Sequence, residues 1–326
     1  MHAAVVNEQH GFDLIDVPDP SPQSGELLLR VSACGICGSD LKAVANMRAG
    51  LVMGHEFAGE IVAVAPDVRG WRVGQRVCAL PLIGCGACAP CITGDVAHCA
   101  TVDMIGVGGS AGAYAEYVRV SARETFELPD AVPTDLGALV EPLAVGLHAV
   151  ERAALRAGDR VLVLGAGPVG LAVTLWARHL GAGEVVVSDP VPHRRTAAQS
   201  LGATGALDPS GGLPDDRYDV VFECVGVPGM LAAGIAATGT HGRLIVAGVC
   251  TKPDPFVPVQ ALVRELTMHF VMYYRRQDFA FTVDMLRRGR IDAGSLVTDR
   301  VDLEGFPAAF EALKHPTTQC KVLVLP

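Results

Sequence analysis

Short runs of alternating apolar and polar residues occupy about the first 130 residues of this chain. Alternation with a period of two is typical of strands with one buried face, and the Gly and Pro residues between the runs indicate turns. This part of the chain is therefore predicted to form a compact β-rich domain. The runs are AAVV at 3–6, ELLLRVSA at 26–33, EFAGEIVAVAP at 56–66, RVGQRVCALP at 72–81 and AYAEYVRVS at 113–121.

The pattern changes near residue 133, where apolar residues begin to recur at helical spacing. Segment 133–155 predicts a helix with Thr134 or Asp135 as its N-cap. Strands that alternate with helices indicate an α/β fold with a doubly wound parallel sheet. The apolar runs that alternate with helical segments beyond this point are 161–167, 184–189, 219–226 and 242–249.

The last part of the chain predicts two helices, at 279–290 and 307–314, and a final strand at 321–326. We expect this tail to return to the first domain. The predicted domain boundaries are 1–143 for the β-rich domain, 144–274 for the parallel-sheet domain and 275–326 for the returning segment.

Composition narrows the class of protein. With 50% apolar and 19% charged residues, the 326-residue chain is typical of an ordered globular protein. A net charge of -9 without a basic stripe argues against a nucleic-acid partner, so we expect small-molecule ligands. The uncharged stretch 161–177 is interrupted by glycines, which favours a buried strand, turn and helix over a membrane span. The first ten residues show no signal-peptide pattern, and we expect a cytoplasmic protein without membrane contact.

Cys37 and His55 lie in a glycine-rich stretch with little core-forming periodicity. A thiolate and an imidazole are ligands that Zn²⁺ accepts, and the acidic neighbours Asp40 and Glu56 are the kind of group that orients a ligating histidine. A third ligand must come from elsewhere in the chain. A site with three protein ligands leaves one position open to a substrate oxygen, so this stretch predicts half of a catalytic metal site.

Residues 85–99, CGACAPCITGDVAHC, place four thiols at a spacing of C-x2-C-x2-C-x7-C. Four thiolates close a tetrahedral zinc shell and leave no open position, so this loop predicts a structural zinc site. The alternative is a set of free or disulfide-paired thiols. The four predicted ligands are Cys85, Cys88, Cys91 and Cys99.

A glycine-rich turn joins the strand predicted at 161–167 to the helix that follows it. Gly165, Gly167 and Gly170 form G-x-G-x-x-G, with Pro168 and Val169 at the start of the helix. In this context the glycines allow close approach of a pyrophosphate to the helix N-terminus. Asp189 closes the next strand, where a carboxylate can bind ribose hydroxyls and repel a 2′-phosphate. NAD is therefore favoured over NADP, although the nearby Arg194 and Arg195 argue the other way.

Taken together and in this order, these motifs resemble the zinc-dependent alcohol dehydrogenases of the medium-chain dehydrogenase/reductase family over essentially the whole chain. The resemblance implies a β-rich, GroES-like catalytic domain and a Rossmann domain for the dinucleotide. It rests on GICGSD at 35–40, GHEFAGE at 54–60, the four-Cys loop, EPLAVGLHA at 141–149 and GAGPVG at 165–170.

The resemblance also implies the ligands of a catalytic zinc. Cys37 and His55 would bind the metal, and Glu141 would fill the third protein position, where a helix-start carboxylate is the alternative interpretation. A glutamate at this position is similar to the polyol (sorbitol) and threonine dehydrogenase branch, whereas alcohol dehydrogenases of the other branch have a cysteine. Glu56 would bind zinc in some states or lie just outside its ligand shell. Two zinc ions per chain are expected.

Three residues near Cys37 match positions of a proton relay. Ser39 matches the hydroxyl that passes on the alcohol proton, and Asp40 would orient His55. Lys42 stands where a histidine is common, so it is a relay group, a clamp for a ribose or substrate oxygen, or an exposed side chain.

The implied reaction interconverts a secondary alcohol, such as a polyol or cyclitol, and a ketone, with hydride transfer to or from NAD. Val249 would flank the nicotinamide, and Lys321 matches a basic position near the cofactor phosphates. A homodimer or homotetramer is expected. The alternatives are an inactive, zinc-stabilised dinucleotide-binding regulatory protein and a zinc-free quinone reductase of the same family; the complete ligand set argues against both.

Overall fold

The computed structural model describes residues 1–213 and 216–326 and divides the chain into two compact units. Unit 1 consists of residues 1–141 and 274–326, and unit 2 of residues 142–273. The chain thus leaves unit 1 once, at Glu141, and returns to it at Tyr274.

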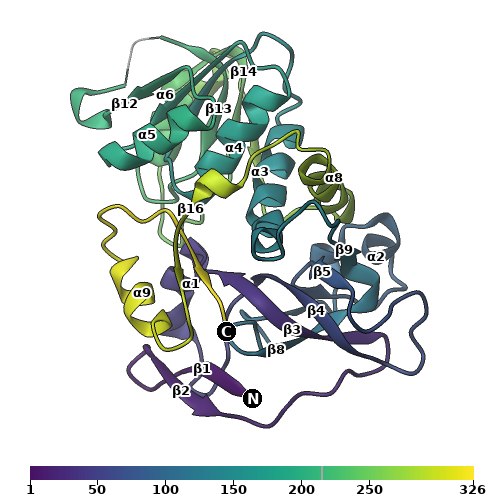
Figure 1. Ribbon diagram of the computed structural model, residues 1–326. Helices are drawn as coiled ribbons and strands as arrows, with labels where there is room; N and C mark the ends of the chain where they lie inside the picture. Colours follow the sequence, from purple (N-terminus) through teal and green to yellow (C-terminus); the bar gives the residue numbers. More distant parts are fainter. Residues whose placement is uncertain (214–215) are drawn as a thin grey trace. The chain divides into compact units, whose positions relative to one another are not determined.

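Unit 1 is built around a largely antiparallel sheet in which β16, β17, β3, β4, β5 and β9 follow one another and β8 pairs with β3. The only parallel pair along this path is β16 with β17, and Figure 1 shows the yellow C-terminal strand beside the purple β3. Two small sheets pair β1 with β2 and β6 with β7. The strands are β1 (His2–Val6), β2 (Phe12–Asp16), β3 (Glu26–Gly35), β4 (Glu56–Val64), β5 (Arg76–Ala79), β6 (Leu82–Ile83), β7 (Asp103–Met104), β8 (Tyr117–Ser121), β9 (Thr125–Glu127), β16 (Val297–Val301) and β17 (Lys321–Val324).

Aromatic side chains hold the core of unit 1 together. Phe306 and Phe310 lie one turn apart on α9 and each ring stands 4.8 Å from the ring of Phe12. Tyr114 packs against the Phe306 ring at 4.4 Å, so the core reaches from the β1 and β2 hairpin to the segment before β8. The α-helices that lie wholly in this unit are α1 (Gly38–Ala43), α2 (Ala89–Thr93), α8 (Arg276–Arg287) and α9 (Phe306–Ala312).

Helix α3 (Val140–Arg152) crosses the boundary between the units and begins later than its sequence pattern predicts. A 3-10 helix, Asp135–Leu139, precedes it, and the Thr134 side chain does not cap this turn. Instead the Thr134 hydroxyl accepts from Arg76 and the Asp135 carboxylate accepts from Arg300. Thr134, one of the two predicted caps, is therefore the N-cap residue of this turn, but its hydroxyl bonds to Arg76 and not to a backbone N–H of the turn.

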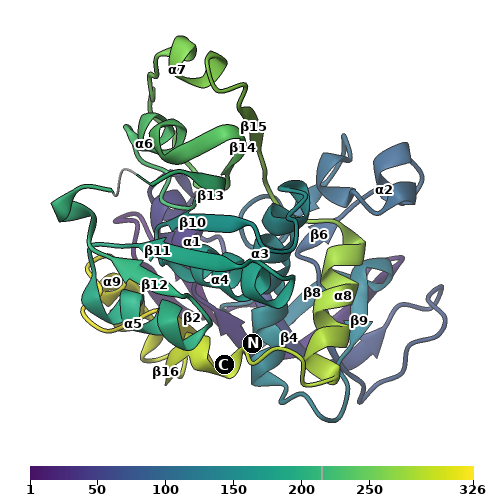
Figure 2. The same cartoon turned by 90° about the horizontal axis from the view of Figure 1, so that it is seen from above.

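Unit 2 contains a six-stranded parallel sheet in the order β12, β11, β10, β13, β14, β15. Figure 2 shows these strands one after another from one edge of the sheet to the other. Its central strands are continuous apolar runs because helices cover both of their faces. Helices α4 and α5 pack on β10 to β12, and α6 packs on β13 and β14. The elements are β10 (Arg160–Leu164), α4 (Pro168–His179), β11 (Glu184–Ser188), α5 (Pro192–Ser200), β12 (Gly205–Leu207), β13 (Tyr218–Glu223), α6 (Met230–Ala237), β14 (Thr238–Val246), α7 (Pro258–Leu262) and β15 (Thr267–Phe270).

The strand order reverses between β10 and β13, so a crevice for a ligand is expected at the carboxyl ends of these two strands. The predicted fold class, a doubly wound parallel sheet with a β-rich unit, is confirmed. No helix among residues 1–213 and 216–326 is long and apolar enough to cross a membrane.

Candidate active site

Cys37 is the N-cap of α1, and the helix start fixes its neighbours around its sulfur. The Ser39 backbone N–H and hydroxyl both donate to Cys37 Sγ, at 3.5 and 3.2 Å. Asp40, three residues into the motif, accepts the Cys37 backbone N–H at 3.2 Å. This capping box places one thiol, one hydroxyl and one carboxylate on the first turn of a short helix.

His55 lies just before β4 and faces Asp40, with 3.2 Å between His55 Nδ1 and Asp40 Oδ1. The Tyr114 hydroxyl donates to the other Asp40 oxygen at 2.6 Å, and Asp40 is fully buried. Burial opposes the protonated imidazole, but Asp40 and Cys37 outweigh it and raise the pKa of His55 well above its usual value. The orienting role predicted for Asp40 therefore has a geometric basis. A side chain at Gly54 would strike the Tyr114 ring, which explains the glycine before His55.

Glu56 brings a carboxylate oxygen to the same place. One ligand atom each from Cys37, His55 and Glu56 lies within 4.8 Å of the others, a donor set that fits a metal ion. Lys321 on β17 donates to both Glu56 oxygens at 2.7 and 2.6 Å and to the Ile36 carbonyl at 3.1 Å. Although desolvation acts in the other direction, Glu56 raises the pKa of Lys321. The cluster therefore contains its own buried counter-charge.

Glu141, at the start of α3, is buried next to this cluster. Burial raises its pKa to about 7, with His55 opposing the rise and Glu56 adding to it. In the described part of the chain, the compact set is Cys37, His55 and Glu56, and Glu141 stands beside it. The carboxylate expected at the third position is thus accompanied by a second one, Glu56, that lies closer to the cysteine and histidine.

The positions of Lys42 and Lys321 could not be predicted from the sequence. Lys42 is exposed in the last turn of α1. Lys321, predicted near cofactor phosphates, has its ammonium on Glu56 and is 1% exposed. The sequence interpretation missed Tyr114, whose hydroxyl donates to Asp40, and Tyr274, which is buried beside Glu141, because no local spacing marks either tyrosine.

The four-Cys lobe, residues 85–99, gathers its four thiols so that all sulfurs lie within 4.8 Å of one another. The surroundings of the four thiols change their pKa values in different directions. The Cys85 N–H, at 3.5 Å, is the largest of the contacts that lower the pKa of Cys99 to about 6. Burial raises the pKa of Cys91 to about 12. This arrangement fits a closed zinc shell of four thiolates.

The glycine-rich turn after β10 has the shape of a phosphate cradle. A Cβ on Gly170 would lie 1.9 Å from the Gly165 carbonyl oxygen, so only glycine lets α4 approach β10. A Cβ on Gly167 would meet nothing within 4 Å, which leaves open space where a pyrophosphate would lie. Pro168 and Val169 form the first turn of α4, whose N-cap is Gly167.

Asp189 directly follows β11, next to this glycine-rich turn, and is buried. Its carboxylate accepts the backbone N–H groups of Ala166 and Val191, both at 2.8 Å. Arg194 lies 3.9 Å from the same carboxylate. On the other side, Val249 is half exposed, and its backbone is so close to Gly226 that a Cβ there would lie 2.5 Å away. The turns after β13 and β14 therefore lie against each other.

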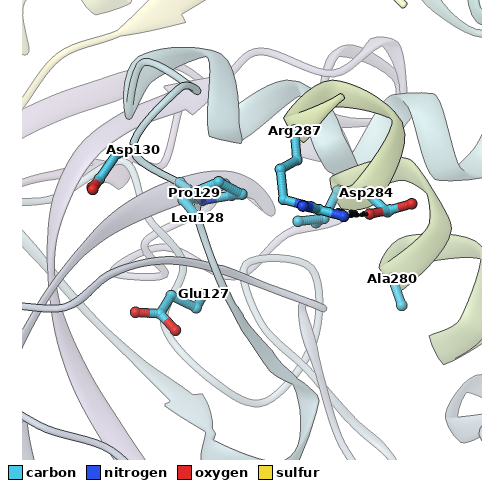
Figure 3. A pocket seen from close by; sticks show the side chains of 8 residues that line it. Glu127, Leu128, Pro129, Asp130, Ala280, Asp284 and Arg287 are labelled. Atoms are coloured by element: carbon cyan, nitrogen blue, oxygen red, sulfur yellow. Dashed lines mark hydrogen bonds and ion pairs between the residues drawn. The ribbon is translucent and has the colours of Figure 1, made fainter. Parts of the chain in front are cut away.

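Two of the hollows on the described part of the chain bear on the location of the site. One, of about 210 Å³, lies at the carboxyl ends of β13 and β14 and is lined partly by Glu223, Gly248 and Lys252. The other, of about 470 Å³, is on unit 1 and is shown in Figure 3, where Arg287 pairs with Asp284 on α8. None of the predicted site residues lines the second hollow, so its size does not make it the active site.

Comparison with known proteins gives the family. The alcohol dehydrogenase GroES-like domain matches residues 23–130, and the zinc-binding dehydrogenase domain matches residues 168–288. The chain is 32% identical to sorbitol dehydrogenase of Bacillus subtilis, covering all of this chain and 97% of that protein. It is 32% identical to L-threonine 3-dehydrogenase of Streptomyces coelicolor, covering 93% of each.

Solved structures agree with this assignment. That of 2R,3R-butanediol dehydrogenase from Bacillus subtilis matches with a TM-score of 0.89 and 31% identity, covering all of this chain and 99% of the other. Others include complexes with NADP and with NADH. The chain belongs to the zinc-binding alcohol dehydrogenases of the medium-chain dehydrogenase/reductase family and is an alcohol oxidoreductase of the polyol branch. The resemblance stated from its motifs is confirmed.

Proposed function

We propose that Cys37, His55 and Glu56, with Glu141 beside them, form the catalytic site of an NAD-dependent dehydrogenase that interconverts a secondary alcohol and a ketone. The observation that carries the proposal is the set of one thiol, one imidazole and one carboxylate that could hold a metal ion. Three ligands leave a fourth coordination position open, whereas four thiolates would fill it. A zinc ion held there supplies a Lewis acid for the substrate oxygen. Because relatives are named for sorbitol, butanediol and threonine, we propose a polyol, cyclitol or similar alcohol as substrate.

The chain's own groups have distinct roles in this proposal. Asp40 holds the His55 ring by its Nδ1, which leaves the other ring nitrogen for the metal. Ser39 is the group next to the cysteine that can accept and pass on the substrate hydroxyl proton. Lys42, which is exposed on α1, is a relay group, a clamp for a ribose or substrate oxygen, or a surface side chain without a role in the reaction. Two zinc ions per chain are proposed, one at this site and one in the four-Cys lobe.

Unit 2 is proposed to bind the dinucleotide, and unit 1 to hold both metals. Gly165, Gly167 and Gly170 would receive the pyrophosphate, and Val249 would lie near the nicotinamide. We favour NAD over NADP because the Asp189 carboxylate faces the turn where a 2′-phosphate would be repelled. Arg194 is proposed as a further cofactor contact, whereas the Lys321 ammonium is buried and paired with Glu56, so Lys321 is not proposed as one. Equal turnover with NADP would reverse the choice of cofactor.

We propose a homodimer, alone or as half of a homotetramer. Strand β15 is the last strand of its sheet, and the segments around it expose Leu262, Val263, Phe270 and Met272, each at least 60% accessible. A two-fold pairing of β15 with its copy would bury this patch. Phe270→Lys should shift the sedimenting species toward the monomer.

All ten cysteines are free, which suits a reducing compartment, and we propose the cytoplasm.

The experiment that tests the catalytic proposal measures zinc per chain by elemental analysis together with NADH formation from a panel of polyols and cyclitols. Cys37→Ala should lower zinc from two to one per chain and abolish turnover. Cys250→Ala, an exposed cysteine outside both clusters, controls for general effects on metal content. One zinc in both the native chain and Cys37→Ala, without turnover, would favour the inactive dinucleotide-binding protein.

A further inference from the structure

Asp189 is hydrogen-bonded through its backbone as well as through its carboxylate. Its N–H donates to the Leu207 carbonyl on β12 at 3.2 Å, and its own carbonyl accepts from the Arg195 guanidinium at 2.7 Å. The next residue is Pro190, which has no backbone N–H to donate. The bond from Arg195 therefore holds the peptide group that leads from Asp189 toward α5.

The Asp189 carboxylate can still accept hydrogen bonds from a ligand. One oxygen accepts the Ala166 N–H and the other accepts the Val191 N–H, both at 2.8 Å. Each carboxylate oxygen has two lone pairs, so each can also accept a hydroxyl. Ala166 lies within the glycine-rich turn, so the position of Asp189 relative to this turn decides whether a bound ribose hydroxyl reaches the carboxylate.

Arg195 also pairs with a carboxylate on the neighbouring strand end. Helix α5, which carries Arg195, packs beside β12 (Figure 2). The Arg195 guanidinium lies 3.2 Å from Asp208 Oδ2, and the other Asp208 oxygen accepts the Ser210 N–H at 2.9 Å. Asp208 directly follows Leu207, whose carbonyl accepts the Asp189 N–H. Arg195 thus joins the end of β11 to the end of β12.

Arg194 and Arg195, which both argue for NADP in the sequence, differ in the structure. The Arg194 guanidinium lies 3.9 Å from the Asp189 carboxylate, and its Nε has no hydrogen-bond partner within residues 1–213 and 216–326. Arg195 instead donates from Nη1 to the Asp189 carbonyl and to Asp208. Because a carboxylate already balances its charge, Arg195 attracts a phosphate less than an unpaired arginine does.

We propose that Arg195 is a positioning residue for Asp189, that Asp208 holds it in this role, and that the pair favours NAD over NADP. The inference rests on the proposed function in that unit 2 binds a dinucleotide through Asp189. Arg195 acts through the Asp189 backbone, and Asp208 balances the charge that would otherwise attract a 2′-phosphate. An ion pair this exposed, 21% for Arg195 and 43% for Asp208, stabilises a fold only weakly, so its loss should change selectivity more than Tm.

The first test uses the double variant Arg195→Met/Asp208→Asn, which loses the bond to the Asp189 carbonyl without a change in net charge. The asparagine keeps an oxygen for the Ser210 N–H. Titration calorimetry measures Kd for NAD and for NADP. We expect NAD to bind about 10-fold more weakly, the typical effect of losing hydrogen bonds to a charged group, and NADP to change less.

Arg178→Met is the matched control, because Arg178 also donates to backbone carbonyls in unit 2 but lies at the end of α4 away from the glycine-rich turn. Both Kd values should stay unchanged in this control. The preference for NAD is compared within each variant, so a smaller folded fraction affects both cofactors equally. An unchanged preference in the double variant would overturn the proposal. An increased preference would also overturn it, because Arg195 would then be a contact of the 2′-phosphate.

The second test uses Asp208→Asn alone, which keeps the bond from Arg195 to the Asp189 carbonyl but removes the balancing charge. NAD should bind as in the native chain, whereas NADP should bind several-fold more tightly. This gain should shrink in about 0.5 M salt, where charge interactions near the surface are screened. Unchanged NADP affinity would overturn the role of Asp208. Failure of the proposed function looks different, because the native chain would then bind neither dinucleotide and both proposals would be wrong.

Discussion

The four-Cys lobe and the catalytic cluster each bring metal-binding atoms within 4.8 Å of one another, but by different means. The four sulfurs of the lobe come from fifteen consecutive residues, 85–99. Backbone N–H groups in and next to the lobe lower the pKa of Cys99. The catalytic cluster takes Cys37 from the start of α1 and His55 and Glu56 from the start of β4, with Glu141 from α3.

The difference lies in what surrounds the ligands. Around the catalytic cluster stand buried groups that are not themselves predicted ligands: Asp40, Tyr114, Tyr274 and Lys321. Asp40 pairs with His55, Lys321 pairs with Glu56, the Tyr114 hydroxyl donates to Asp40, and Tyr274 is buried beside Glu141. A closed thiolate site needs only its own loop, whereas an open mixed site needs a scaffold from distant parts of the chain.

The largest expected effect is on stability, when the lobe loses a ligand. Cys91→Ser removes a buried sulfur from the four-Cys set, and loss of a structural metal belongs to the most destabilising changes, on the order of 5 kcal/mol. A drop in Tm of roughly 10 °C or more is expected, together with the loss of one zinc. Thermal unfolding and elemental analysis check this, with Cys250→Ser as control. Unchanged Tm and zinc content would show that the lobe is not a zinc site.

Lys321→Met tests the scaffold of the open site. It leaves Glu56 buried without its counter-charge, and breaking a buried ion pair typically costs about 3 to 5 kcal/mol. The double variant Lys321→Met/Glu56→Gln removes both charges and should be more stable than the single variant. Urea unfolding of all four members of the cycle measures the coupling. A single-variant cost below about 1 kcal/mol would contradict the buried-pair description.

The same contrast explains what the sequence could predict. The lobe and the glycine-rich turn could be predicted because their residues are neighbours in sequence and each spacing implies one geometry. The pair of Lys321 and Glu56 joins positions 265 residues apart, and nothing local to Lys321 distinguishes it from a cofactor contact. Glu141 was predicted as the third ligand and Glu56 as a ligand in some states. The sequence could not show that Glu56 joins the compact set with Cys37 and His55, because the relative reach of two carboxylates depends on tertiary packing.

The fold shows the same limit. The long apolar runs predicted the central strands of both units, but the three-residue β12 has no alternation to reveal it. The helix predicted from residue 133 begins as a 3-10 turn after Thr134, and the Thr134 and Asp135 side chains bond to Arg76 and Arg300, two residues far away in the sequence.

A smaller effect is expected at Tyr114, whose hydroxyl donates to the buried Asp40. Tyr114→Phe keeps the ring in the aromatic core but leaves one carboxylate oxygen without that donor, at a cost of about 1.5 to 3 kcal/mol. We expect weaker metal binding at the catalytic site and an unchanged lobe zinc. Denaturant unfolding and zinc retention during dialysis against chelator measure both. Loss of the lobe zinc before the catalytic zinc would contradict the prediction that Tyr114 acts on the catalytic site.

The smallest effect concerns Glu124, the carboxylate between Arg123 and Arg276 at the edge of the lobe. Burial raises the pKa of Glu124 although both arginines oppose the rise. The folded chain therefore binds this proton more readily than the unfolded chain does, so stability from this group is present at low pH and is lost as pH rises through the folded-state pKa. Glu124→Gln cannot titrate. The unfolding free energy of the native chain minus that of Glu124→Gln should fall as pH rises above about 4.5, the ordinary pKa of a glutamate. A difference that grows with pH would mean that the two arginines dominate and that the lobe is anchored by a net favourable charge cluster.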